Sequence, residues 1–174
     1  MFNNSNHGAT HASAKLNRYC LLLAAVSCVL FLSVALYLQL VKQMYPCPLC
    51  IIARYVYIAV FLVCLVTALW PAKITAQRLG AGLAGLIALG GVGLGLYHQW
   101  VLAHPAESCG IDPTKTLLNQ IFTAQWLPNV FYASGMCSDV YPPFLGIQIP
   151  MWSLLCCMAL TTGLFWVAFR SNSK

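Results

Sequence analysis

The chain has 174 residues, of which 60% are hydrophobic and 7% are charged, and its formal net charge is +6. Soluble domains typically contain about 45–50% apolar and about 25% charged residues, so this composition excludes an ordinary water-soluble protein. The apolar residues form long continuous runs instead of alternating with polar ones, which predicts transmembrane helices. Because the basic residues gather at the ends of these runs, the positive charge does not indicate a nucleic-acid partner.

The first apolar run covers residues 19–41 and follows a polar segment, residues 1–18, that contains no acidic residue. At 1.5 Å per residue this run would extend about 34 Å, which is long enough to cross a bilayer. A cleaved signal peptide has a shorter apolar core of about 7–15 residues and a small-residue cleavage site. We therefore expect a mobile tail followed by the first transmembrane span.

Residues 42–50 connect the first span to the second and contain the motif Cys-Pro-Leu-Cys at positions 47–50. Cysteines at this spacing occur both in thiol redox centres and in zinc knuckles. Prolines before and within the motif predict a stiff turn. Cys50 should then lie near the start of the next helix, with Arg54 one turn further on, and both the helix dipole and this cation favour a reactive thiolate. The alternative is that Arg54 is only a basic residue that extends to the membrane surface.

Three further apolar runs, at residues 51–70, 79–97 and 151–169, predict the remaining transmembrane helices. The third span is rich in glycine, which allows neighbouring helices to approach closely. The predicted fold class is therefore an all-α membrane protein, a four-transmembrane-helix bundle. We expect residues 1–174 to form a single membrane domain.

The distribution of charge predicts the orientation of this bundle in the membrane. If the four spans alternate, six basic residues fall on one side, and three fall on the other together with all three acidic residues. The positive-inside rule then places both termini in the cytoplasm and the loops 42–50 and 98–150 on the outer side. The six inner bases are Lys15, Arg18, Lys73, Arg78, Arg170 and Lys174, and the three outer bases are Lys42, Arg54 and Lys115.

The long outer loop, residues 98–150, contains one amphipathic stretch. Its large apolar residues would gather on one side of a helix, with polar residues on the other; they are Leu117, Leu118, Ile121, Phe122 and Trp126. This pattern predicts a short interfacial helix lying flat on the membrane, with Trp126 at the level of the headgroups. The alternative is an ordinary helix packed within the loop.

Nine cysteines are present, and five of them fall in or beside apolar runs, where cysteine acts as a small buried hydrophobe: Cys20, Cys28, Cys64, Cys156 and Cys157. The four loop cysteines are Cys47, Cys50, Cys109 and Cys137. Because Cys109 and Cys137 are far apart in sequence and do not form a second close pair, we expect no metal site. They are either a redox pair or a structural disulfide, which would contribute about 3–4 kcal/mol in the loop-entropy model. The flanking serines and glycines favour an exposed and labile bond.

Three motifs in combination are recognisable. They are Cys-Pro-Leu-Cys with Arg54 downstream, Ala-Ser-Gly-Met-Cys at positions 133–137, and Phe-Leu-Gly at 144–146 leading to Ile-Pro-Met-Trp at 149–152. Together they resemble the DsbB family, the bacterial inner-membrane disulfide bond formation proteins. The resemblance covers about residues 19–169, and the combination is specific although each motif alone would be weak.

The resemblance implies an enzyme, a protein thiol–quinone oxidoreductase that reoxidises DsbA, a periplasmic dithiol oxidase of the thioredoxin fold. The electrons would pass to a membrane quinone, either ubiquinone or menaquinone. Cys109 and Cys137 would be the outer pair, with Cys109 forming the mixed disulfide with DsbA. Cys47 would exchange with Cys137, and Cys50 would face the quinone. The protein would lie in the bacterial inner membrane, with its termini cytoplasmic and its redox loops periplasmic.

Two further residues are implied to contact the quinone. Arg54 would stabilise both the thiolate and the charge of the reduced quinone, and His98 matches the family histidine near that cofactor. A lone histidine at a membrane interface can also be purely structural. Ala53 stands where well-known members carry an acid, so we expect no proton-handling role at that position. The segment from Pro105 to Cys109 is shorter than in those members, which affects how far Cys109 can reach.

Two alternatives remain for the function. A quinone reductase of the vitamin K epoxide reductase type is also a helical bundle with Cys-x-x-Cys, but its loop cysteines precede that motif, whereas here they follow it. The other alternative is a non-catalytic protein with four spans whose loops are held by structural disulfides. Thiol trapping separates a redox enzyme from this non-catalytic protein, because only a redox pair would become reduced when quinone is depleted.

Overall fold

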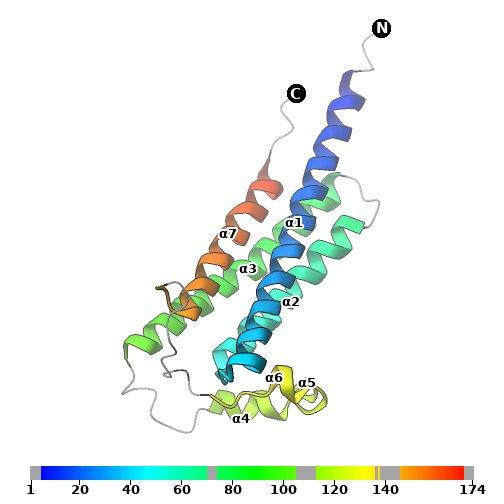
Figure 1. The fold of residues 1–174 in the computed structure, drawn as a ribbon. Helices are drawn as coiled ribbons and strands as arrows, with labels where there is room; N and C mark the ends of the chain where they lie inside the picture. The colour runs from blue at the N-terminus through cyan, green and yellow to red at the C-terminus, as the bar shows by residue number, and fades with distance from the viewer. Residues whose placement is uncertain (1–4, 70–73, 105–112, 136, 138–145, 171–174) are drawn as a thin grey trace.

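The computed structural model describes residues 5–69, 74–104, 113–135, 137 and 146–170. Four long helices form a bundle: α1 (Ser5–Lys42), α2 (Pro48–Leu69), α3 (Ile74–Ala103) and α7 (Ile149–Phe169). Three short helices lie across one end of it: α4 (Pro113–Gln120), α5 (Phe122–Trp126) and α6 (Pro128–Phe131) (Figure 1). Each long helix is long and apolar enough to cross a membrane. This confirms the predicted all-α, four-helix membrane fold.

The arrangement of the bundle separates its two ends. α1 begins and α7 finishes at one end, whereas the start of α2 and the helices α4–α6 lie at the other (Figure 1). α1 is longer than the predicted span, since it begins at Ser5 and no proline interrupts it. The segment that we predicted to be a mobile tail is therefore helical from Ser5 onward.

The most extensive helix–helix contact joins α3 to α7 through small residues on one face of α3. A Cβ atom added at Gly91 would lie 2.9 Å from the Cys157 sulfur, and one added at Gly95 would lie 3.1 Å from Leu154. Alanines on the same face, Ala81, Ala84 and Ala88, are fully buried. Small residues here allow the two backbones to approach, as expected for helices that associate within lipid.

The outer surface of the bundle is apolar. Large hydrophobic side chains are exposed along the long helices, including Leu23, Leu30, Leu83, Leu86 and Trp166. In water such a surface would be unfavourable, but in a bilayer it faces hydrocarbon chains. The exposed residues therefore agree with the composition in indicating a membrane-embedded protein.

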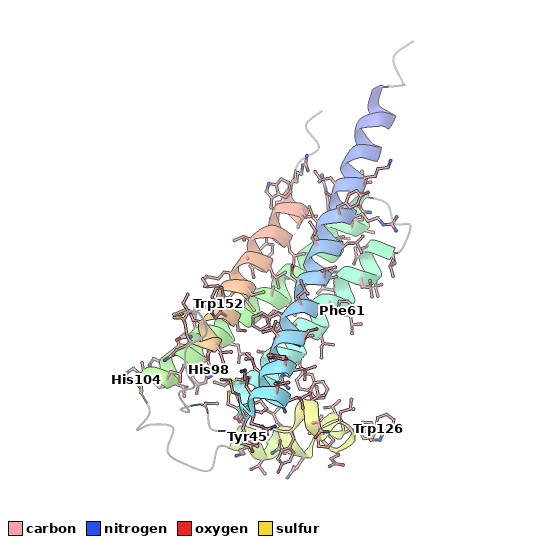
Figure 2. The ribbon with its side chains drawn as sticks, in the orientation of Figure 1. Tyr45, Phe61, His98, His104, Trp126 and Trp152 are labelled. Atoms are coloured by element: carbon pink, nitrogen blue, oxygen red, sulfur yellow. The ribbon has the colours of Figure 1, made fainter. Side chains whose placement is uncertain are left out.

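The amphipathic stretch of the long loop forms two helices instead of one, because the chain bends at Ile121 between α4 and α5. Leu118 is buried, whereas Leu117, Phe122 and Trp126 are exposed. Trp126 points away from the bundle (Figure 2). These exposed apolar side chains agree with a position at the membrane surface.

Helices α5 and α6 are attached to α2 by a small core of their own. Ile51 of α2 is fully buried in a cluster with Ala124, Phe131 and Ala133. The ring of Tyr55 stacks on Phe131 with centroids 5.0 Å apart, and its hydroxyl is hydrogen-bonded to Thr123. The short helices are thereby held beside the first two turns of α2, where the Cys-x-x-Cys motif lies.

Candidate active site

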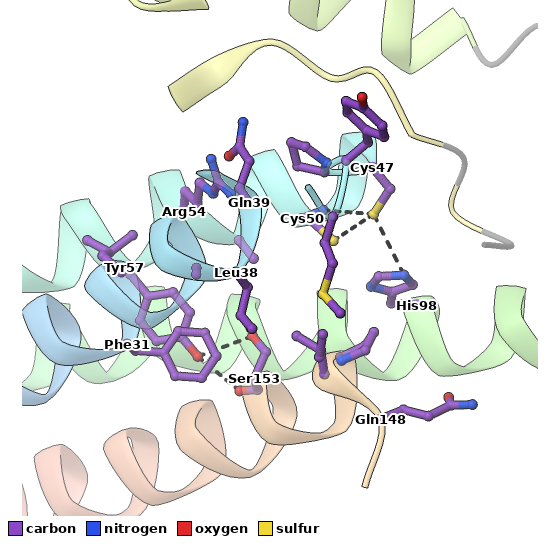
Figure 3. Close-up of a pocket in the computed structure, with 18 of the residues that line it drawn as sticks. Phe31, Leu38, Gln39, Cys47, Cys50, Arg54, Tyr57, His98, Gln148 and Ser153 are labelled. Atoms are coloured by element: carbon purple, nitrogen blue, oxygen red, sulfur yellow. Dashed lines mark hydrogen bonds between the residues drawn. The ribbon is translucent and has the colours of Figure 1, made fainter. Parts of the chain in front are cut away.

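The Cys-x-x-Cys motif forms the N-terminal cap of α2. The carbonyl of Cys47 accepts the first helical hydrogen bond, from the Ile51 N–H at 3.1 Å, and Pro48 occupies the first helical position, which suits proline. The sulfur of Cys47 accepts a hydrogen bond from the Cys50 N–H at 3.3 Å, in the way that a serine hydroxyl caps a helix. The two sulfurs are 2.7 Å apart, with Cys47 donating (Figure 3). The pair is therefore held in a geometry that can close to a disulfide.

Cys47 is buried, with 4% of its surface exposed. Hydrogen bonds with the sulfur of Cys137 and then with that of Cys50, followed by burial, raise the pKa of the Cys47 thiol well above its ordinary value. Cys47 is thus protonated at neutral pH and donates to Cys50. Of the two sulfurs, Cys50 is therefore the one placed to carry negative charge.

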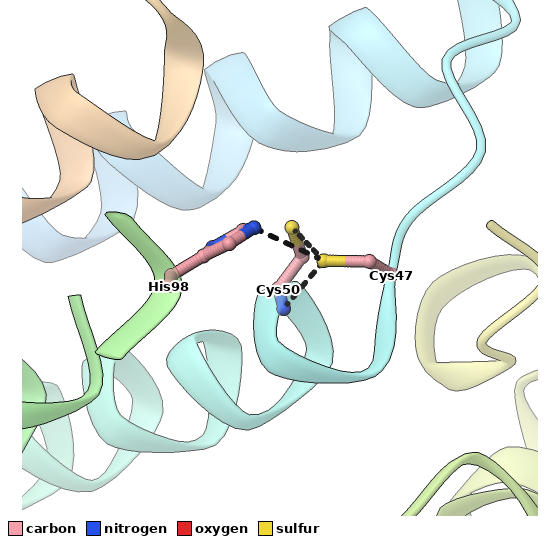
Figure 4. A group of neighbouring side chains, drawn as sticks. All are labelled: Cys47, Cys50 and His98. Carbon is pink, nitrogen blue, oxygen red and sulfur yellow. Dashed lines mark hydrogen bonds between the residues drawn. The ribbon is translucent and has the colours of Figure 1, made fainter. Parts of the chain in front are cut away.

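His98 comes from the C-terminal part of α3 and is 7% exposed. Its Nε2 lies 3.8 Å from the Cys47 sulfur (Figure 4), and its ring also makes a hydrogen bond with the backbone of Cys137. The structure therefore places His98 beside both Cys47 and Cys137. The two residues are 51 positions apart in the sequence, and this spacing does not by itself indicate that Cys47 and His98 are neighbours.

Arg54 lies one turn beyond Cys50 and is 5% exposed, so it does not extend to the membrane surface as the alternative interpretation required. Its Nη1 donates to the carbonyl of Val130 in α6, while its buried Nε has no hydrogen-bond partner. Electrostatic attraction acts between its charge and the sulfurs of Cys50 and Cys47. Arg54 therefore joins α6 to α2 and leaves one N–H donor free beside the cysteine pair.

Residues 133–135, which we call the docked segment, bring Cys137 to Cys47. The N–H groups of Ser134 and Gly135 both donate to the carbonyl of Pro46, at 3.2 and 3.1 Å. Gly135 makes this approach possible, because a Cβ atom there would lie 2.5 Å from the carbonyl oxygen of Tyr45. Cys137, two residues further on, packs against Cys47.

Two side chains of α4 hold the docked segment from its other side. The amide of Asn119 bonds both backbone groups of Ala133: its Nδ2 donates to the carbonyl at 3.0 Å, and its Oδ1 accepts from the N–H at 2.9 Å. The ammonium of Lys115 donates to the carbonyl of Ser134 at 3.0 Å. Sequence reasoning missed Asn119, Lys115 and Gly135 as residues of the site, because each acts through a backbone distant in sequence.

A mostly apolar pocket extends from the two cysteines into the bundle (Figure 3). Its cavity volume is about 120 Å³, and the pocket is partly open to the outside. Phe31 and Tyr57 stack in its wall with ring centroids 4.6 Å apart, and the Tyr57 hydroxyl donates to the carbonyl of Ser153 at 3.0 Å. Polar atoms without a partner also occur in its lining: Arg54 Nε and Gln39 Oε1.

The structure brings together five of the six predicted site residues: Cys47, Cys50, Arg54, His98 and Cys137. Cys109, the sixth, lies outside the described residues, as do Phe144 and Leu145 of the third motif. The predicted pairing of Cys109 with Cys137 therefore stays a prediction.

Comparison with known proteins identifies the family. The family model described as "Disulfide bond formation protein DsbB" matches residues 17–167. Disulfide bond formation protein B of Herminiimonas arsenicoxydans is 46% identical over 159 residues, covering 91% of this chain and 99% of that protein. The protein of the same name from Ralstonia nicotianae is 40% identical over 158 residues, covering 91% and 98%. This chain therefore belongs to the DsbB family, and it is a multi-pass membrane protein with an oxidoreductase role in disulfide bond formation.

Proposed function

We propose that the protein oxidises a DsbA-like periplasmic thioredoxin-fold oxidase and passes the electrons to a membrane quinone. The observation that carries the proposal is the position of the Cys47–Cys50 pair: Cys137 packs on one side of it, and an apolar pocket opens on the other. Such a pair can exchange with a loop disulfide and also meet a lipid-soluble oxidant.

The first steps are thiol–disulfide exchanges, in which a thiolate attacks a disulfide sulfur. A thiolate of the reduced partner would attack Cys109 of a Cys109–Cys137 disulfide, forming the mixed disulfide and releasing the Cys137 thiolate. Cys137 would then attack Cys47 of the Cys47–Cys50 disulfide, which forms a Cys47–Cys137 bond and releases the Cys50 thiolate. The contact between Cys137 and Cys47 supports this order.

The second thiol of the partner would then attack its own sulfur in the mixed disulfide and leave oxidised, releasing the Cys109 thiolate. Attack of Cys109 on Cys137 would restore the outer disulfide and leave Cys47 and Cys50 reduced. One partner disulfide would thus be formed for each two electrons placed on this pair. Because the pKa of Cys47 is raised, the Cys47 sulfur would take up a proton once it is released, while Cys50 holds the negative charge.

The lining of the pocket suits a quinone. Its wall is apolar and includes the stacked Phe31 and Tyr57 rings, which suit a flat ring and a hydrocarbon tail. The unpartnered N–H of Arg54 is a donor for a carbonyl oxygen, and the unpartnered Oε1 of Gln39 is an acceptor. Arg54 would therefore hold a carbonyl of the oxidised ring next to Cys50, whereas Gln39 Oε1 would accept only from a hydroxyl of the reduced ring. A bound quinone, ubiquinone or menaquinone, supplies a two-electron acceptor there, while the Arg54 charge stabilises the Cys50 thiolate.

The proposed location is the bacterial inner membrane, with both termini in the cytoplasm and the cysteine loops in the periplasm. Arg18, Arg78 and Arg170 lie toward the end of the bundle where α1 begins and α7 finishes. Cys47, Cys137 and Lys115 lie toward the other. The positive-inside rule assigns the arginine-rich end to the cytoplasm.

The test is reoxidation of reduced DsbA by membranes that contain the protein and either ubiquinone or menaquinone. Replacing Cys50 by Ser should abolish turnover, because the quinone-facing sulfur is lost. Cys20→Ser, which changes a cysteine in α1 away from the pocket, is the matched control and should retain activity. Full activity of the Cys50→Ser variant would end the proposal.

A further inference from the structure

The two cysteines and His98 form a compact group of metal-ligating atoms. The Cys47 and Cys50 sulfurs and one ring nitrogen of His98 all lie within 4.8 Å of one another, and these are ligand types that zinc prefers (Figure 4). We infer that, when Cys47 and Cys50 are reduced, these three side chains bind one thiophilic divalent cation such as Zn²⁺. Bound metal would prevent the pair from forming its disulfide.

The geometry is close to that of a tetrahedral zinc site. With Zn–S near 2.3 Å and Zn–N near 2.0–2.1 Å, neighbouring ligand atoms are about 3.5–3.8 Å apart. The His98 nitrogen already lies 3.8 Å from the Cys47 sulfur. The two sulfurs, now 2.7 Å apart, would have to separate by about 1 Å, which a rotation of the Cys50 side chain can supply.

The supporting backbone holds two of the ligands in place. Cys47 is fixed as the cap of α2, and the His98 ring is oriented by its hydrogen bond with the backbone of Cys137. A histidine that binds a metal usually donates its other ring N–H to a carboxylate, a backbone carbonyl or water. The three ligands therefore come from two packed helices, α2 and α3, and need little rearrangement.

Among the residues that the structure describes, three and not four supply ligands to this site. Cys137 is described and lies beside Cys47, but it is not part of the group whose atoms all approach one another. Three protein ligands leave a fourth position open to water, as in catalytic zinc sites, whereas closed four-ligand sites are structural. We therefore place an inhibitory, removable ion here and not a permanent part of the fold.

Binding and oxidation exclude each other chemically. Coordination of one Zn²⁺ would form two Zn–S bonds, one to the Cys50 thiolate and one to the Cys47 sulfur, which would lose its thiol proton, with no electron transferred. The disulfide form has no thiolate and cannot bind the ion in this way. The effect on activity rests on the proposed function, but the binding itself does not.

The experiment is a titration of the purified, reduced full-length protein with Zn²⁺ in competition with a chromophoric chelator. Repeating it with Cd²⁺ lets the sulfur-to-metal absorption band count the thiolate ligands. We expect one tight ion that is bound through two thiolates, and loss of that ion once Cys47 and Cys50 are oxidised. His98→Ala and His98→Gln should each weaken the affinity at least about tenfold.

The matched control is His104→Ala, which removes an exposed histidine that follows the last residue of α3 and stacks on Trp100. Its affinity should equal that of the unchanged protein, whereas Cys50→Ser should lose the tight ion. Equal affinity in both His98 variants, or undiminished binding by the oxidised pair, would overturn the inference. A protein that oxidises DsbA but binds no ion would refute this inference alone, and one that binds the ion without oxidising DsbA would refute only the proposed function.

Discussion

The docked segment predicts a strong effect of a single methyl group at Gly135. In Gly135→Ala the new Cβ would lie 2.5 Å from the Tyr45 carbonyl oxygen and 3.2 Å from its carbonyl carbon. These are backbone atoms that cannot rotate away, so the segment itself must retreat by roughly 1 Å to restore normal contact. Its two hydrogen bonds to the Pro46 carbonyl, at 3.1 and 3.2 Å, would then be lost or much weakened.

The expected magnitude follows from these two contacts. Two hydrogen bonds contribute about 1–3 kcal/mol in total, which corresponds to roughly 5- to 150-fold in the docking equilibrium. A misplacement of about 1 Å can by itself slow a reaction about 100-fold. We therefore expect exchange between Cys137 and Cys47 to slow by about 10- to 100-fold.

The assay is a single turnover with reduced DsbA, quenched in acid and alkylated, in which the Cys47–Cys137 disulfide is followed over time. Quinone-dependent oxidation of the reduced Cys47–Cys50 pair should keep its rate, because that step does not use the docked segment. Gly163→Ala in α7 is the control, since nothing lies within 4 Å of a Cβ added there. An unchanged exchange rate in Gly135→Ala would show that docking on Pro46 does not present Cys137.

Three further predictions concern other contacts of the site. Asn119→Ala removes both hydrogen bonds to Ala133 and should slow the same exchange step up to about tenfold in the quenched assay. Asn119→Asp keeps one acceptor and should be less affected. Equal rates in the two variants and the unchanged protein would contradict this. Lysine carries all its donors on one nitrogen, so Arg54→Lys cannot place one donor at Val130 and another at the separate position of Nε. The variant should raise the apparent KM for quinone in quinone-depleted membranes and change DsbA binding little. An unchanged KM would remove Arg54 from the cofactor site. Because the pKa of Cys47 is raised, little of its thiolate is present at or below the ordinary thiol pKa of about 8.5. The alkylation rate of reduced Cys47, followed by mass spectrometry of the labelled peptide, should therefore still increase with pH at pH 9. A plateau near pH 8.5 would contradict the raised pKa.

Hydropathy was sufficient to predict the four spanning helices, because each must satisfy its own backbone within lipid and therefore forms a long apolar run. The residues at which the helices begin were harder to predict from the sequence. α2 begins at Pro48, three residues before the predicted span, because the cap is made by Cys47 through its sulfur and carbonyl. α1 begins at Ser5, within a segment whose polar side chains gave no apolar signal.

The proximity of the cysteine motif and Arg54 was predictable, because their spacing places them on two successive turns at the start of one helix. The contacts around them were not, since they join segments far apart in the chain. Asn119 binds the backbone of Ala133. Every residue has the same backbone amide, so the sequence does not show which one Asn119 binds. Likewise, the position of His98 beside Cys47 depends on how α3 packs on α2, which a single sequence does not specify.

The burial of Cys47 has a consequence for which molecules can deliver electrons. With 4% of its surface exposed, this sulfur is shielded by protein, and the pocket next to it is largely apolar. A small charged thiol such as glutathione would have to shed its hydration shell to reach it, and burying an unpaired charge is strongly unfavourable. Under the proposed function, small free thiols would therefore not reduce the Cys47–Cys50 disulfide directly. The quinone would then oxidise protein thiols and not the free thiols of the surroundings.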